Sequence, residues 1–118
     1  MIHQKGTAKL NCKFPHRRAM LRNQIIQLIT HGHLVTTKAR VKEVRRLAEK
    51  LVTVARKGNN FNARRRAYAM LPYKQEALLK LFNEIAPRYV DRPGGYTRMI
   101  PMGKRTSDTA TIARLEWV

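Results

Sequence analysis

The stretch from Thr36 to Lys57 constrains the fold more than any other part of the chain. Its apolar residues recur at every third or fourth position, as Val41, Val44, Ala48, Leu51 and Ala55. This spacing places them along one face of an α-helix. A hydroxyl of Thr36 or Thr37 can cap the start of the helix, and Gly58 can take the left-handed conformation that ends it. We therefore predict a helix roughly 30 Å long with one face buried in a core.

The other faces of this predicted helix are strongly basic. They carry Lys38, Arg40, Lys42, Arg45, Arg46, Lys50, Arg56 and Lys57, against the acids Glu43 and Glu49. A charged face that contacts only water usually mixes both signs, because opposite charges four residues apart stabilise a helix. The excess of cations favours a surface that faces RNA or DNA, with an ordinary solvated face as the alternative.

Composition supports a nucleic-acid partner. The chain has 118 residues, of which 43% are hydrophobic, enough for one domain with one core. Its 25 Lys and Arg residues against 7 acids give a formal net charge of +18, and such a domain repels itself unless a polyanion neutralises it. A membrane surface is the other candidate, but no apolar run approaches the roughly 20 residues that span a bilayer. We expect no membrane partner, and we see no secretory signal in residues 1–14.

The N-terminal segment is basic and lacks a core pattern. Residues 1–15 show no sustained hydrophobic period and contain Gly6, Asn11 and Pro15, and no acid precedes Glu43. We predict that residues 1–15 form an extended basic arm that becomes ordered only against a partner. Residues 16–118 would then form a single globular domain.

The remaining pattern predicts an α+β fold. In order, it indicates a helix over 16–31, a strand over 33–36, the long helix, helices over about 60–71 and 74–86, and strands over 96–102 and 109–118. Asn59 or Asn60 can cap the third helix, and Pro87 would close the fourth. The order helix, strand, three helices, two strands implies two layers, with helices covering a small sheet. Arginines in the first turns of the 16–31 helix oppose its dipole, which suggests an external anion.

The segment 92–98, RPGGYTR, is the most distinctive short motif. Gly94 and Gly95 allow a close backbone approach or a positive φ angle. Arg92 and Arg98 could hold phosphate, while Tyr96 could pack in the fold or stack on a base or sugar. The alternative is an ordinary turn into a strand. The motif is not a dinucleotide fingerprint, because the third glycine and the preceding strand are missing.

We find no pattern of an enzyme or of a metal site. Cys12, His16, His31 and His33, with His3, match no standard zinc spacing. A Cys–His nucleophile would lack an orienting acid, and the scattered acids form no carboxylate pair. We expect no catalytic residue, no metal, no cofactor and no small-molecule substrate.

Several segments carry a family resemblance. They are 16–23 (HRRAMLRN), 36–37 (TT), 42–51 (KEVRRLAEKL), 81–82 (LF), 86–89 (APRY) and 94–98 (GGYTR), in the family's order and over nearly the whole chain. In these segments the chain resembles the ribosomal protein L17 family of the large subunit. The resemblance implies a compact α/β protein that binds large-subunit rRNA near the exterior of the peptide exit tunnel, beside neighbouring ribosomal proteins. Such a protein braces RNA and does not catalyse.

The sequence also departs from the family. Ile2, Gln4 and Cys12 stand where family members are usually basic, so the arm lacks cations at these positions. The segment 107–113, SDTATIA, and Pro93 are more similar to mitochondrial members than to typical bacterial ones. The expected location is therefore the large ribosomal subunit, in the bacterial cytoplasm or the mitochondrial matrix.

Charge pattern and resemblance together predict a set of RNA-binding residues. These are His3, Lys5, Lys9, Lys13, His16, Arg17, Arg18, Arg22, Asn23, Lys38, Lys42, Arg45, Arg46, Arg64, Arg65, Arg88, Arg92, Gly94, Gly95, Tyr96, Arg98, Lys104 and Arg105. The competing function is a free-standing basic regulator that binds RNA or DNA.

Overall fold

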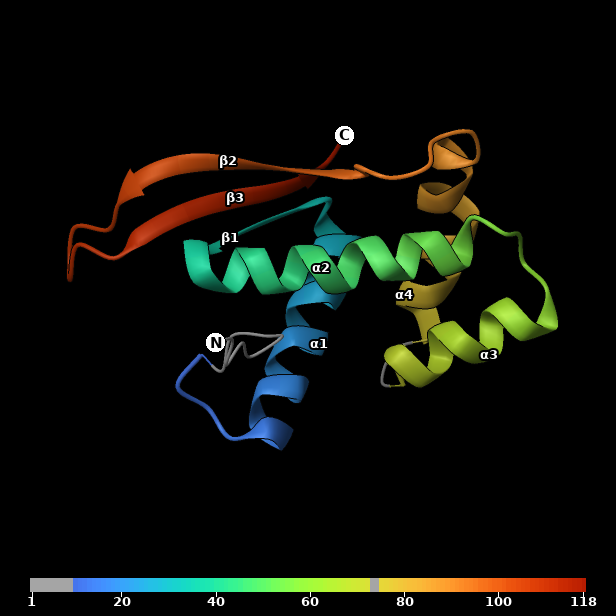
Figure 1. The fold of residues 1–118 in the computed structure, drawn as a ribbon, viewed down its shortest axis with the longest axis horizontal. Helices are drawn as coiled ribbons and strands as arrows, with labels where there is room; N and C mark the ends of the chain where they lie inside the picture. Colours follow the sequence, from blue (N-terminus) through green and yellow to red (C-terminus); the bar gives the residue numbers. More distant parts are fainter. Residues whose placement is uncertain (1–9, 73–74) are drawn as a thin grey trace, which may run out of the picture.

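The computed structural model describes residues 10–72 and 75–118 (Figure 1). Its elements are α1 (Phe14–His31), β1 (His33–Thr37), α2 (Lys38–Ala55), α3 (Phe61–Met70), α4 (Gln75–Lys80), the π-helical turn η1 (Leu81–Ile85), the 3-10 turn η2 (Ala86–Tyr89), β2 (Thr97–Lys104) and β3 (Thr111–Trp117). The predicted element order and the α+β class are confirmed for these residues. Most of the predicted arm, with His3, Lys5 and Lys9, lies outside them.

Helix α1 begins at Phe14, earlier than the predicted start at His16. Pro15 occupies its first turn, where a missing N–H costs nothing because the first helical N–H groups have no partner in the helix. Gly32 ends the helix with a φ angle of 83° and donates its N–H to Leu28 O at 2.9 Å. Leu21, Ile25, Leu28 and Ile29 form the buried stripe of this helix.

Helix α2 buries the predicted stripe, together with Val52 and most of Glu43. Thr37 occupies the N-cap position, but its hydroxyl makes no capping hydrogen bond, so the predicted hydroxyl cap is wrong. Gly58 does have a positive φ angle, of 108°, and its N–H donates to Ala55 O at 3.1 Å. The chain therefore leaves α2 through a left-handed glycine, as its position suggested.

The fourth helix does not close at Pro87 as predicted. Its α-helical part ends at Lys80, the next turn widens into η1, and η2 continues through Pro87 to Tyr89. Pro87 lacks an N–H and its ring would clash with the carbonyl four residues earlier in a regular helix. The widened turn, in which the Ala86 N–H donates to Leu81 O, and the tighter turn after it remove that clash.

The capping prediction for α3 is confirmed at Asn60, whose side-chain oxygen accepts the Ala63 N–H at 2.8 Å. This bond satisfies one of the N–H groups that a helix leaves unpaired at its start. It fixes where the chain enters α3 after the loop that follows α2.

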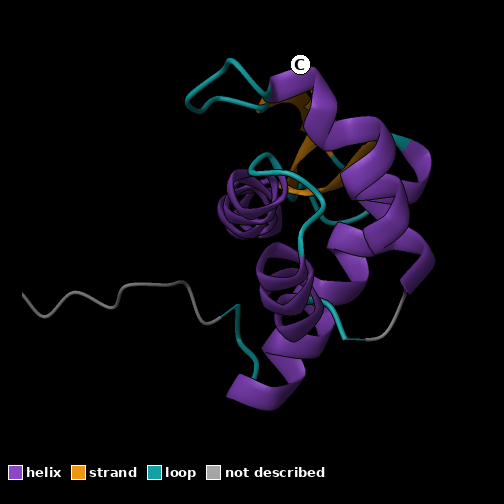
Figure 2. Ribbon diagram, turned by 90° about the vertical axis from the view of Figure 1, so that its right-hand side faces the viewer, coloured by secondary structure: helices purple, strands orange, loops and turns teal. Residues whose placement is uncertain are grey.

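The three strands form one antiparallel sheet in the order β1-β3-β2. Helix α2 runs along one face of the sheet, α1 crosses α2 and reaches β1 at its C-terminal end, and α3 lies on the far side of α2 from the strands (Figure 1). Figure 2 looks along α2 and shows the strands to its upper right and other helices below it and to its right. Leu34, Ala113, Leu115 and Trp117 are buried between the layers. The indole N–H of Trp117 donates to Leu28 O at 3.3 Å, which ties β3 to α1.

The β2–β3 hairpin extends past the end of α2 (Figure 1). Its pairing is irregular between Pro101 and Lys104. Beyond that irregularity, the Arg105 guanidinium donates two hydrogen bonds to the Asp108 carboxylate, at 2.9 and 2.7 Å. These two hydrogen bonds close the turn locally, without contacts to the core.

Within the part of the chain that the structure describes, no helix is both long and apolar enough to cross a membrane.

Candidate nucleic-acid interface

A basic crevice separates the N-terminal half of α1 from α2. Its volume is about 210 Å³, and we call it the α1–α2 crevice. It is lined by Phe14, Arg17, Arg18 and Leu21 from α1 and by Glu43, Arg46, Leu47 and Lys50 from α2. The fold therefore brings together three of the predicted RNA-binding arginines from two helices, and adds Lys50, which was not in the predicted set. Cations so close together repel one another unless an anion lies between them.

The exposed ring of Phe14 organises one wall of the crevice. The guanidinium carbons of Arg17 and Arg18 lie 5.5 and 5.2 Å from the centre of this ring, within the range of cation–π attraction. The ring is 59% exposed. Sequence reasoning missed Phe14 because it was assigned to the arm. Its spacing three and four residues before the arginines, which places side chains together on a helix, was the signal that could have revealed it.

The opposite wall contains the only carboxylate of the crevice lining, that of Glu43. It is 8% exposed and lies 3.6 Å from the Arg46 guanidinium. An ion pair at the edge of a core is screened less than one in open water, so Glu43 restricts where Arg46 can point. The lining still carries Arg17, Arg18, Arg46 and Lys50 against this one acid.

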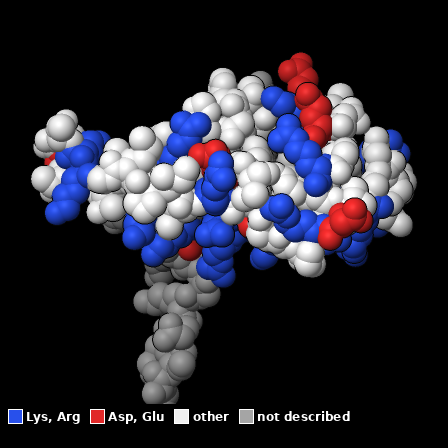
Figure 3. Space-filling model, turned by 90° about the horizontal axis from the view of Figure 1, so that it is seen from above, with Lys and Arg blue, Asp and Glu red and all other residues white. Residues whose placement is uncertain are grey.

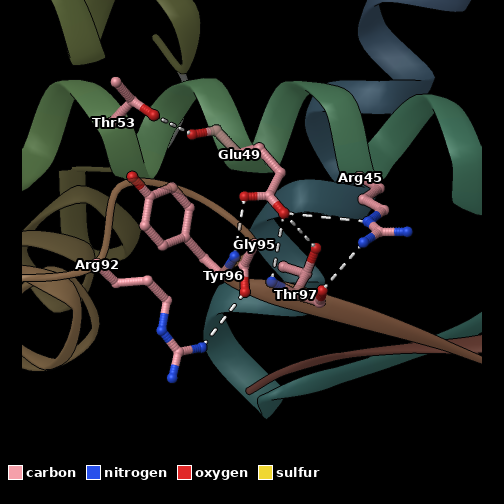
Figure 4. Close-up of polar contacts among 7 residues, drawn as sticks. All are labelled: Arg45, Glu49, Thr53, Arg92, Gly95, Tyr96 and Thr97. Carbon is pink, nitrogen blue, oxygen red and sulfur yellow. Dashed lines mark hydrogen bonds and ion pairs between the residues drawn. The ribbon is translucent and has the colours of Figure 1, made fainter.

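The start of β2 is held by a carboxylate from α2 (Figure 4). Glu49 accepts the Tyr96 N–H at 3.1 Å, the Thr97 N–H at 3.4 Å and the Thr97 hydroxyl at 3.1 Å. Arg45 lies 4.0 Å from the same carboxylate and donates to Thr97 O at 3.3 Å. Glu49 and Arg45 thus hold the end of the segment 92–98 against α2. Neither role was visible in the sequence.

The ring of Tyr96 lies in the core. It is 1% exposed and packs against Tyr89, with ring centres 5.2 Å apart, and its hydroxyl accepts from Arg56 at 3.2 Å. The sequence left two roles open for this ring, packing in the fold or stacking on RNA. In the structure the ring packs in the fold.

Gly95 has a φ angle of 66°, the left-handed conformation that only glycine adopts without strain, whereas Gly94 does not have a positive φ. Arg92 donates to Gly95 O at 3.4 Å and covers the Tyr89 ring at 5.6 Å. Arg98 pairs with Glu116 at 3.1 Å, and this hydrogen bond lowers the pKa of Glu116 below its ordinary value. Both arginines of the motif therefore interact with other residues of this protein.

Arg22 also points inward. Its Nε donates to Met70 O at 3.0 Å and its second guanidinium nitrogen donates to Ala69 O at 3.3 Å, so it ties α1 to the end of α3. The other predicted residues that the structure describes lie at the surface, fully or partly exposed. They are Lys13, His16, Asn23, Lys38, Lys42, Arg64, Arg65, Arg88, Lys104 and Arg105.

Positive charge is not confined to the crevice. Viewed from the side of β2 and β3, Lys and Arg recur from the hairpin tip to the helical end, and acidic side chains form a few small groups (Figure 3). Among the described residues, no group of three His, Cys, Asp or Glu side chains is placed to hold a metal ion.

A sequence model of the family described as ribosomal protein L17 matches residues 20–118. The chain belongs to the ribosomal protein L17 family.

Full-length relatives agree with this membership of the L17 family. The large ribosomal subunit protein bL17 of Sulfurimonas denitrificans is 48% identical over 118 residues, which cover 100% of both chains. The bL17 protein of Desulforudis audaxviator is 47% identical over 113 residues, 96% of this chain and 99% of the relative. The bL17 protein of Dictyoglomus thermophilum is 46% identical over 118 residues, again 100% of both chains. The predicted resemblance to the L17 family is confirmed.

These L17 relatives are bacterial. They give no support to a mitochondrial origin, which Pro93 and the segment 107–113 had suggested.

Proposed function

We propose that the chain is a structural constituent of the large subunit of the bacterial ribosome, where it binds and braces large-subunit rRNA. Membership of the L17 family and the names of its relatives support the subunit. The family resemblance further suggests a position near the exterior of the peptide exit tunnel, with neighbouring ribosomal proteins as partners. In this proposal the protein holds RNA in place and catalyses no reaction.

The observation that carries RNA binding is the α1–α2 crevice. A phosphate entering it would meet Arg17 and Arg18 on one side and Arg46 and Lys50 on the other. Guanidinium groups suit this task because their planar donors match phosphate oxygens. Phe14 beside them offers an exposed ring on which a sugar or base can pack.

The surface residues of the predicted set extend this contact. We propose phosphate contacts from Lys13, His16, Asn23, Lys38, Lys42, Arg64, Arg65, Arg88, Arg92, Arg98, Lys104 and Arg105, and from His3, Lys5 and Lys9 of the N-terminal segment. Contacts to phosphate position a protein on RNA without reading its sequence. The inward-facing Arg22, Arg45 and Tyr96 would support this surface from within.

A pair of double variants tests the crevice. Arg18→Ala with Lys50→Ala removes one exposed cation from each wall, while Lys57→Ala with Arg66→Ala removes two exposed cations elsewhere. Affinity for a large-subunit rRNA fragment is measured as a function of salt. Each lost phosphate contact lowers the slope of log affinity against log salt by roughly 0.7 to 0.9. We expect this slope to fall by roughly 1.4 to 1.8 in the crevice variant and to change little in the control variant.

Equal losses in the two double variants would mean that net charge alone drives binding, and the crevice would then have no special role. The competing function, a free-standing regulator of RNA or DNA, would predict binding to short RNA or DNA without stable association with large subunits.

A further inference from the structure

A second cavity, distinct from the α1–α2 crevice, lies between α3 and α4. Its volume is about 240 Å³, and we call it the α3–α4 groove. It is lined by Asn59, Arg64, Tyr68, Gln75, Leu78, Leu79 and Phe82. Binding sites for drug-sized molecules are larger, roughly 300 to 1,000 Å³. The groove therefore suits a group smaller than a drug-sized molecule.

The floor and rim of this groove differ in exposure. Leu78 and Phe82, at 7% and 8% exposed, form an apolar floor. Tyr68 and Leu79, at 47% and 56% exposed, stand at its rim on facing helices. Apolar side chains of both helices therefore line one continuous groove.

The polar groups of the groove favour a nucleotide. Arg64, four residues before Tyr68 on the same face of α3, is the only charged side chain that residues 10–72 and 75–118 contribute to the lining. The side-chain amides of Asn59 and Gln75 can each donate and accept, and within residues 10–72 and 75–118 neither amide forms a hydrogen bond. An aromatic ring, amide groups and an arginine are the means by which proteins hold an unpaired RNA base and its phosphate.

The surrounding charge agrees with this chemistry. Helix α3 carries Arg64, Arg65 and Arg66 and no acid. Glu76 directly follows the lining residue Gln75 in the chain, but it lines a different cavity, beside α1. A basic or neutral protein segment would gain nothing from this charge, whereas a polyanion would.

We propose that the α3–α4 groove accepts one unstacked base of the bound RNA. Tyr68 stacks on the base, Leu78 and Phe82 contact its edge, Asn59 and Gln75 hydrogen-bond to its polar groups, and Arg64 pairs with its phosphate. This proposal rests on the proposed RNA-binding function and adds to it a defined site for a single base.

The test uses two end-labelled RNA duplexes of equal length, one fully paired and one with a single bulged adenosine. Their affinities for the full chain are measured by fluorescence anisotropy. We expect the wild-type chain to bind the bulged duplex about tenfold more tightly, within the range that one stacked base supplies. Tyr68→Ala should abolish this preference and Tyr68→Phe should retain it, because phenylalanine keeps the ring. Since Tyr68 is 47% exposed, neither variant should alter the melting temperature appreciably.

Equal affinity of the wild-type chain for both duplexes, or a preference that survives Tyr68→Ala, would overturn the proposal while leaving phosphate binding intact. If Tyr68→Ala weakened incorporation into large subunits without changing the preference for the bulge, the groove would serve a protein neighbour, which also overturns it. Failure of the wild-type chain to bind either duplex would instead contradict the proposed RNA-binding function.

Discussion

At the scale of single residues, Glu49 joins two segments that are 47 residues apart in the chain. Its carboxylate accepts from the backbone of Tyr96 and Thr97, both nearly fully buried, and from the Thr97 hydroxyl. Buried N–H groups that lose their acceptor pay a desolvation cost. An acid that looked like a minor counter-charge on a basic helix is therefore a structural anchor for β2.

Replacing this anchor should destabilise the fold. We expect Glu49→Ala to lower the free energy of unfolding by about 1–3 kcal/mol, because the Tyr96 and Thr97 N–H groups would lose their acceptor. Glu84→Ala, which removes an exposed acid, is the charge-matched control and should change it little. Urea unfolding of the three proteins makes the comparison. Equal midpoints for the two variants would show that Glu49 does not anchor β2.

The adjacent glycines provide a second residue-scale prediction. Gly95 needs its left-handed backbone, whereas Gly94 does not, and neither has atoms within 4 Å of an added Cβ. Gly95→Ala should therefore cost about 1 kcal/mol or more through backbone strain alone, and Gly94→Ala should cost little. Thermal melting of both variants checks this, and a Gly95→Ala protein as stable as Gly94→Ala would refute the assigned conformation.

At the scale of elements, α2 has two functions on adjoining faces. One face supplies the buried stripe, and another supplies a wall of the α1–α2 crevice. The stripe was predictable because helical spacing is a local property of the sequence. The anchoring by Glu49, the inward bonds of Arg22 and the widened turn before Pro87 were not, because each depends on a partner or clash that only the packed structure reveals. For the same reason the arginines of the crevice could be predicted one by one, but the crevice that they form could not.

The stripe of α2 can be tested with two leucines of different exposure. Leu51 is 1% exposed and Leu79 is 56% exposed. We expect Leu51→Ala to lower the free energy of unfolding by about 2–5 kcal/mol, since it leaves a cavity in the core. Leu79→Ala should stay within about 0.5 kcal/mol of wild type. Chemical denaturation distinguishes them, and similar losses for both would contradict the orientation of α2.

The turn of the β2–β3 hairpin has a titration signature. Hydrogen bonds from Arg105 and then from the Ala110 N–H lower the pKa of Asp108 from 3.8 to about 2. A depressed pKa means that the contribution of Asp108 to stability is present above pH 3.8 and is lost as pH falls through about 2.

We expect Arg105→Ala to raise the pKa of Asp108 back towards its ordinary value, as measured by NMR of the carboxyl carbon. Arg98→Ala, on the same hairpin, should leave Asp108 unchanged and raise the pKa of Glu116 instead. An unaltered Asp108 titration in Arg105→Ala would mean that the paired turn does not persist in solution.

At the scale of the whole molecule, the fold places a net charge of +18 on a small α+β body. The hydrophobic layers hold the elements together, while cations line the α1–α2 crevice and recur across the face of β2 and β3 (Figure 3). Such a body gains stability when a polyanion surrounds it, which is what an rRNA-bracing protein of the L17 family would require.

The most direct test of that claim is cosedimentation with large ribosomal subunits at increasing salt. We predict that the wild-type chain stays with the subunits at salt concentrations that release an unrelated protein of similar net charge. The Arg18→Ala, Lys50→Ala double variant should dissociate at lower salt than the Lys57→Ala, Arg66→Ala control. Release of the wild-type chain together with the unrelated basic protein would contradict the account, and so would retention of the crevice variant as strong as that of wild type.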